Sequence, residues 1–228
     1  QAALRSVTYH STSDDPTATS ATRTITWQAT DADAGSLGAQ SGTVTSTINL
    51  TAVNDAPVVG GDLGALAYTE NGVATVIAGT ITLSDADDTQ MSSATTTISS
   101  GFTAGDVLGF TDQNGISGSY DSSTGVLSFS GTATVAQYQA ALRSVTYHST
   151  SEDPTATSAT RTITWDVTDA NSDGRGAQTS TAVTGNIDVT ALSDTPVVGG
   201  DRSITVEESA SVVITSADLG ATDVDDPD

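Results

Sequence analysis

The chain has 228 residues, of which 36% are hydrophobic and 4% aromatic, and its formal net charge is −22. A field of that sign repels nucleic acid and anionic membranes. The charge therefore predicts no nucleic-acid partner. No run of 18 apolar residues is present, so the sequence also predicts no membrane insertion in this segment. Cysteine is absent, so no disulfide supports the fold, and bound metal is the candidate that replaces it.

Internal repeats organise the chain. Residues 1–27 recur at 139–165 with one change, Glu152 in place of Asp14, so the unit is about 138 residues long. Such periodicity predicts tandem modules. We expect a first segment, residues 1–55, that is the C-terminal part of a module. The second segment, residues 56–195, is expected to be a complete module, and the third, residues 196–228, the N-terminal part of the next. The chain is then expected to be a piece of a longer repetitive protein.

Within the second segment, the pattern predicts strands joined by turns and one short helix. Residues 54–61 are the expected linker. Asn71-Gly72 is the strongest hairpin signal, and Val135, Tyr138 and Leu142 have helical spacing within 134–142. In chain order, the expected strands are 66–70, 73–83, 94–99, 106–111, 116–120, 126–130, one containing Val145 and Tyr147, one containing Ile163 to Val167, and 179–191.

These elements predict an all-β fold, an antiparallel β-sandwich of seven to nine strands with one short helix per module. In an up-and-down sandwich, an odd number of strands places the two ends of a module at opposite poles. Consecutive modules would then stack end to end into a rod.

Such a topology gathers acidic residues at the poles. At the first junction, Asp169, Asn171 and Asp173 would meet the linker and the loops around Asp85 and Asp14. At the second junction, Glu70, Glu152, Asp153 and Asp194 would meet the third segment. Calcium prefers six to eight oxygen ligands in flexible geometry. The candidate calcium ligands are Asp14, Asp15, Asp31, Asp33, Asn54, Asp55, Glu70, Asp85, Asp87, Asp88, Glu152, Asp153, Asp169, Asn171, Asp173, Asp194, Glu208, Asp223, Asp225 and Asp226.

One candidate has the first half of a calcium-loop motif. Residues 169–174 read D-x-N-x-D-G, in which alternate side chains point inward and glycine permits the sharp turn. Position 12 of the loop is Ser180, so the motif is not an EF-hand. The first-segment loop with Asp31 and Asp33 lacks the third acid and predicts a weaker site. The alternative interpretation of the acids is surface solubility, but they fall at predicted turns and linkers and recur in phase.

These residues resemble a known family. Asn54-Asp55-Ala56-Pro57, Glu70, the Asp85-x-Asp87 loop, the late D-x-D/N loop and residues 122–145 are similar to cadherin-like and immunoglobulin-like repeats of giant bacterial surface adhesins. Many of those adhesins are of the RTX type and are exported by type I secretion. The resemblance implies tandem Ig/cadherin-like sandwiches in an extracellular, calcium-dependent stalk that supports cell adhesion or biofilm. Ser193 and Thr195 depart from the linker motif, and residues 202–228 look closer to a related cadherin-like or proteoglycan-type repeat.

Other functions stay open. A catalytic site needs perturbed groups in one pocket, whereas these acids recur at turns, so the sequence predicts no enzyme. One alternative is a carbohydrate-binding module that uses exposed Thr, Ser and Asn faces. Another is a fibre subunit in which copies of the chain join head to tail through exposed sheet edges. The expected partners are therefore adjacent repeats, other copies of the chain, or surface glycans.

Overall fold

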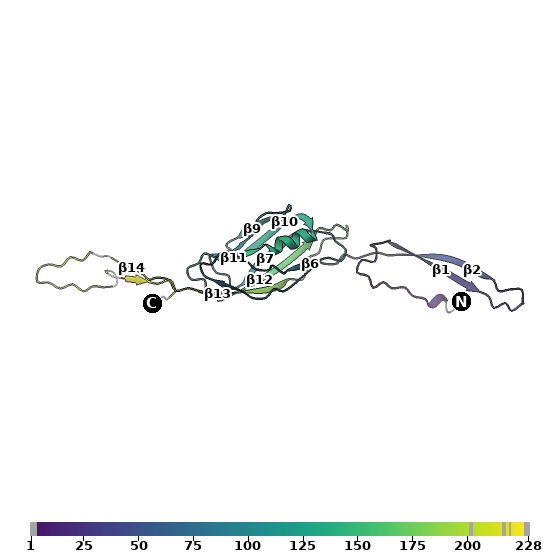
Figure 1. Cartoon of the computed structure of the whole chain (residues 1–228), viewed down its shortest axis with the longest axis horizontal. Coiled ribbons are helices and arrows are strands. Elements are labelled where there is room, and N and C mark those ends of the chain that lie inside the picture. The colour runs from purple at the N-terminus through teal and green to yellow at the C-terminus, as the bar shows by residue number, and fades with distance from the viewer. Residues whose placement is uncertain (1–3, 201–202, 216–217, 219, 226–228) are drawn as a thin grey trace.

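A computed structural model describes residues 4–200, 203–215, 218 and 220–225. The chain is elongated, with a central body flanked by two smaller parts along the long axis (Figure 1). The first segment begins with a short 3-10 helix, η1 (Leu4–Ser6), and continues as a hairpin of β1 (Thr22–Thr30) and β2 (Ser41–Asn49). Among the described residues, no helix is long and apolar enough to cross a membrane.

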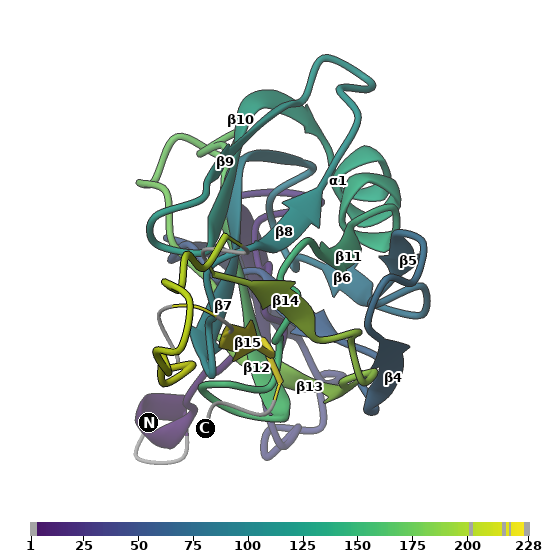
Figure 2. The same cartoon turned by 90° about the vertical axis from the view of Figure 1, so that its left-hand side faces the viewer.

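The central body is a β-sandwich. Its larger sheet has six strands in the order β4 (Leu66–Thr69), β13 (Val183–Thr190), β12 (Thr160–Asp169), β7 (Gln90–Ser100), β10 (Val126–Thr134) and β9 (Ser117–Asp121). The smaller sheet has β5 (Thr75–Val76), β11 (Thr146–Ser149) and β8 (Asp106–Gly109), and β3 (Val58–Gly60) pairs with β6 (Thr82–Ser84). Viewed along the long axis, β5 and β11 lie on the same side as the helix (Figure 2).

Strict alternation along β12 shows why these residues form a two-layer structure. Ile163, Trp165 and Val167 are buried, while Thr164 and Asp166 between them are only partly buried, as expected when successive side chains point to opposite faces. The buried residues pack with Leu108 and Tyr147 of the smaller sheet into one hydrophobic core. The prediction of an all-β sandwich is confirmed.

The expected helix is also present, as α1 (Val135–Arg143). Thr134 caps its N-terminus, with the side chain accepting from the Gln137 N–H and the Gln137 side chain accepting from the Thr134 N–H, a capping box. Tyr138, Ala141 and Leu142 are the buried face. The helix therefore closes the sandwich beside β6.

Three details of the expected topology were wrong. The turn at Asn71-Gly72 exists, with Asn71 at a φ of 61°, but β4 pairs with β13 and β5 pairs with β11, so the turn crosses between sheets. The expected strand 73–83 is interrupted by a turn in which the Ile81 N–H donates to the Ala78 carbonyl at 3.1 Å, so β5 ends at Val76 and β6 begins at Thr82. The sheet is not up-and-down, since β7 lies between β10 and β12, and the β4–β13 pair is parallel.

Both flanking parts repeat pairings of the central body. Trp27 pairs with Val44 in the β1–β2 hairpin, as Trp165 pairs with Val183 in β12–β13. In the third segment, β14 (Val197–Gly199) pairs with β15 (Gly220–Thr222) in the same register in which β3 pairs with β6. The repeats seen in the sequence therefore recur as equivalent pairings in the structure.

Candidate metal sites at the two junctions

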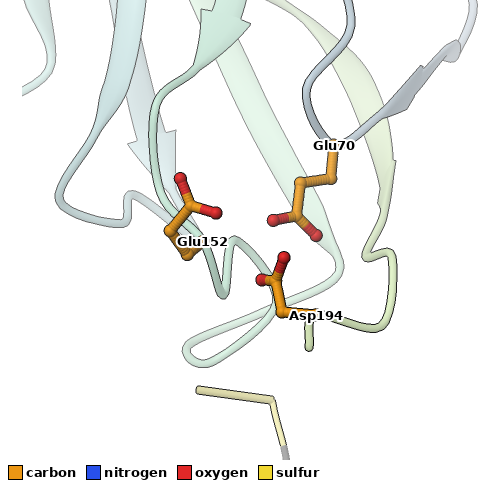
Figure 3. Close-up of side chains that lie close together, drawn as sticks. All are labelled: Glu70, Glu152 and Asp194. Atoms are coloured by element: carbon orange, nitrogen blue, oxygen red, sulfur yellow. The ribbon is translucent and has the colours of Figure 1, made fainter. Parts of the chain in front are cut away.

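Three carboxylates meet at the second junction, between the second and third segments. Oxygens of Glu70, Glu152 and Asp194 lie within 4.8 Å of one another, and the side chains converge from separate stretches of chain (Figure 3). Glu70 follows β4, Glu152 lies in the loop after β11, and Asp194 lies in the linker after β13. The fold thus joins residues that are far apart in the sequence.

Glu70 is the most informative member of this group because only 2% of it is exposed. Its Oε2 accepts from the Leu192 N–H at 2.7 Å, whereas its Oε1 has no hydrogen-bond partner among the residues that the structure describes. Asp194 Oδ2 also lacks a partner within that part of the chain. A buried carboxylate oxygen without a donor is costly, so this position suits a bound cation.

The third segment contributes to the same place. A pocket of about 560 Å³ is lined by Glu152, Asp194, Thr195, Val197, Thr222, Asp223 and Val224. The N–H of Asp194 donates to Asp225 Oδ2 at 2.6 Å, and the N–H of Asp225 donates to Asp223 Oδ1 at 3.1 Å. Asp225 Oδ1 has no hydrogen-bond partner within the described ranges of the chain. Carboxylates from both sides of the linker therefore surround one pocket.

The first junction has the same construction. Its pocket, of about 470 Å³, is lined by Asp14, Asp55, Ala56, Val58, Ser84, Asp85 and Ala86, which are the repeat equivalents, one for one, of the residues around the second pocket. The N–H of Asp55 donates to Asp87 at 3.2 Å, and the N–H of Asp87 donates to Asp85 Oδ1 at 3.1 Å. Two junctions with different sequences thus have one arrangement of acids.

Asp85, Asp87 and Asp88 form a second cluster at the first junction, again with oxygens within 4.8 Å. Asp85 Oδ2, Asp88 Oδ2 and Asn54 Oδ1 are buried, and none of the described residues gives them a hydrogen bond. Burial raises the pKa of Asp87 to about 6; the N–H of Asp55 opposes this shift, and the neighbouring carboxylates reinforce it. Carboxylate and amide oxygens are hard ligands, so the donor set fits calcium.

The loop with the calcium-like motif lies beside this cluster, but its oxygens face donors of the chain itself. Asp169 Oδ2 accepts from Asn54 Nδ2 at 3.0 Å and from the Gln178 N–H at 2.8 Å. Asn171 Oδ1 accepts from the Gly176 N–H at 2.6 Å. Asp173 forms an ion pair with Arg175 at 2.6 Å. Calcium binding by this loop stays a prediction, and the structure shows the loop closed by internal hydrogen bonds.

Among the described residues, the remaining predicted ligands are not members of either three-carboxylate cluster. In the first segment, Asp31 Oδ1 accepts from the N–H of Asp33, and Asp33 is exposed. The equivalent bond in the second segment runs from the Asn171 N–H to Asp169 Oδ1. Asp15 and Asp153 accept from Thr17 and Thr155 within their own loops. Glu208 is exposed, and Asp226 lies outside the described residues.

Sequence reasoning missed two contacts at the first junction. The N–H of Ser172 donates to Asp88 Oδ1 at 2.5 Å. Arg175 Nη2 donates to Thr17 Oγ1 at 3.1 Å, which joins the first and second segments directly. The sequence does contain a signal for Arg175: the two repeats differ at this position, where the first segment has Leu37.

No family model matches the sequence. No curated protein matches it either. Among solved structures, the chain is similar to protocadherin gamma B2 extracellular cadherin domains 1–5, with 16% sequence identity and a TM-score of 0.32. That match covers 76% of this chain and 27% of the other, so the chain spans about a quarter of its length. The sheet topology described above, and not this likeness, assigns the fold.

Proposed function

We propose that the chain is a stalk segment of a large extracellular adhesin of the bacterial surface, in which calcium bound at each junction fixes consecutive repeats to one another. The proposal rests on the pocket shared by both junctions. At one of them, buried Glu70 has a carboxylate oxygen without a donor among the described residues, and oxygens of Glu70, Glu152 and Asp194 lie within 4.8 Å of one another. The partners of each repeat are then its neighbours in the chain, and its role is mechanical rather than enzymatic.

Charge explains why the metal would change the shape of the protein. Without a cation, like charges at each linker repel one another, and the net charge of −22 adds to that repulsion. Calcium that takes ligands from a loop, the linker and the following segment restricts all three at once. A site filled at about 100 times its dissociation constant adds roughly 2.7 kcal/mol to stability. Extracellular modules commonly bind calcium with dissociation constants of about 10⁻⁴–10⁻³ M.

A distance measurement between repeats tests the proposal. Because the chain has no cysteine, spin labels can be attached through Thr26→Cys on β1 and Ser128→Cys on β10, both exposed positions. We expect a broad distance distribution in chelator and a narrow one in millimolar calcium. Asp55→Asn at the first junction should abolish the narrowing, whereas Asp194→Asn at the second should leave this label pair unaffected. Distributions of equal width with and without calcium would count decisively against the stalk.

A further inference from the structure

A fully buried arginine lies beneath the second junction. Arg161, on β12, is 0% exposed. Its Nη2 donates to the Pro154 carbonyl at 2.5 Å and its Nη1 donates to the Ser158 carbonyl. Both acceptors belong to the loop between β11 and β12, which also contains Glu152. One guanidinium thus holds two points of the loop that supplies a carboxylate to the junction.

The guanidinium is itself held in place. Its Nε donates to Asp106 Oδ2 at 2.7 Å, an ion pair in which both side chains are 0% exposed. Asp106 Oδ1 also accepts from the Tyr147 hydroxyl at 2.6 Å, and Asp106 Oδ2 accepts from the Thr103 N–H at 2.8 Å. Burial, reinforced by the Asp106 carboxylate, raises the pKa of Tyr147 far above its ordinary value. The donors around Asp106 therefore fix the position from which Arg161 reaches the loop.

The same contact occurs in the first segment. Arg23 Nη2 donates to the Pro16 carbonyl at 2.8 Å, and Arg23 Nη1 donates to the Ser20 carbonyl at 2.6 Å. These carbonyls are the repeat equivalents of those of Pro154 and Ser158, and their loop contains Asp14. Within the described part of the chain, no carboxylate pairs with Arg23. The same two-carbonyl contact is therefore present in both repeats.

We propose that Arg161 and Arg23 are positioning residues, each of which holds the ligand loop of one junction and thereby sets the calcium affinity of that junction. This inference rests on the proposed function. A planar fork with several donors fixes two carbonyls at once, which a lysine ammonium cannot reproduce. Neither arginine touches the metal, so both act through Glu152 or Asp14. Groups that orient metal ligands commonly change affinity by about 10–100-fold when they are removed.

Arg23 provides the cleaner test, because it lies outside the core of the second segment. We would compare Arg23→Gln and Arg23→Lys with the unchanged chain by calorimetric calcium titration, each in an Asp194→Asn background that isolates the first junction. Both variants should bind calcium about tenfold more weakly at this junction. In the opposite background, Asp55→Asn, the second junction should keep its affinity. If Arg23 acted only through its charge, Arg23→Lys would bind as the unchanged chain does.

A second readout needs no metal. In calcium-free buffer, hydrogen exchange at the Thr17 amide, which donates to Asp15 within the loop, should accelerate in both variants. Amides of β7 and β12 should exchange as before. Calcium binding by the unchanged chain together with unaltered affinity in Arg23→Gln would overturn the inference and leave the proposed function intact. A chain that binds no calcium would overturn both. Arg161→Lys should weaken the second junction alone, and weakening of both junctions would contradict a local role.

Discussion

Replacing Glu70 by Gln should stabilise the protein without calcium and should remove most of the stabilisation that calcium adds. The substitution keeps the size of the side chain and an oxygen that can accept from the Leu192 N–H. It removes the charge of the one carboxylate in its cluster that is almost fully buried. Without metal, this relieves repulsion with Glu152 and Asp194. With metal, it removes an anionic ligand and weakens binding.

The size of the effect follows from the geometry. The carboxylate oxygens lie within 4.8 Å of one another, and two unit charges at that limit repel by about 3 kcal/mol at an effective dielectric constant of 20, and by less than about 1 kcal/mol in water. Asp194 is half-buried and Glu152 is exposed, so we assign the larger value to Asp194 and the smaller to Glu152. Relief of about 4 kcal/mol in all would raise the melting temperature of the metal-free protein by roughly 8–16 °C. In saturating calcium, the variant should gain little of the roughly 2.7 kcal/mol that a well-filled site adds to the unchanged chain.

Thermal unfolding followed by circular dichroism, in chelator and in millimolar calcium, measures both the metal-free melting temperature and its rise on calcium binding. Glu208→Gln is the matched control, because Glu208 occupies the same position in the third segment and is exposed there. We expect it to melt like the unchanged chain in both buffers. If Glu70→Gln lowered the melting temperature equally in both buffers, Glu70 would be a structural hydrogen-bond acceptor and not a metal ligand.

Three further predictions address the core, the helix and the acidic cluster. Trp165→Ala should cost about 3–5 kcal/mol in urea denaturation, whereas Trp27→Ala should cost far less, since Trp27 is only half-buried; equal losses would show that the first segment has a packed core. Thr134→Ala should cost about 1 kcal/mol through the lost helix cap, and a loss below a few tenths would show that the cap contributes little. The pKa of Asp87 is about 6, above its unfolded value of about 3.9, so metal-free melting temperatures should fall as pH rises from 4 to 6. Calcium-loaded protein should show the opposite trend, because the ion needs the ionised form. Asp87→Asn should reduce the metal-free slope, and an unchanged slope would assign it to other acids.

Local patterns predicted much of this fold. The hairpin of β9 and β10 and the helix α1 depend on contacts between near neighbours, which the sequence encodes directly. The crossover after β4 could not be predicted, because the same Asn-Gly turn serves a hairpin or a change of sheet, and only the partners β13 and β11 decide. Pairing between distant strands is a property of the whole core.

The candidate site shows the same division. Repetition in phase pointed to the acids at the junctions, and the structure brings Glu70, Glu152 and Asp194 together. The motif at residues 169–174 is ambiguous from sequence, because alternate Asp and Asn side chains serve equally well to bind a cation or to close a loop on its own N–H groups. What distinguishes the two uses is whether an oxygen remains without a donor after folding. That cannot be read from the order of residues.

The two repeats differ in length by one residue, and the structure shows where the extra residue goes. Val167 and Ser180 exchange hydrogen bonds, with the Ser180 N–H donating to the Val167 carbonyl and the Val167 N–H donating to the Ser180 hydroxyl. Beyond that point, β13 resumes the register of β2. An insertion there is absorbed before the strand that leads to Asp194. A tandem array built this way can gain or lose residues between the Val167–Ser180 contact and the start of β13, so its surface can vary from copy to copy. The linker acid that follows the strand keeps the same position in each copy.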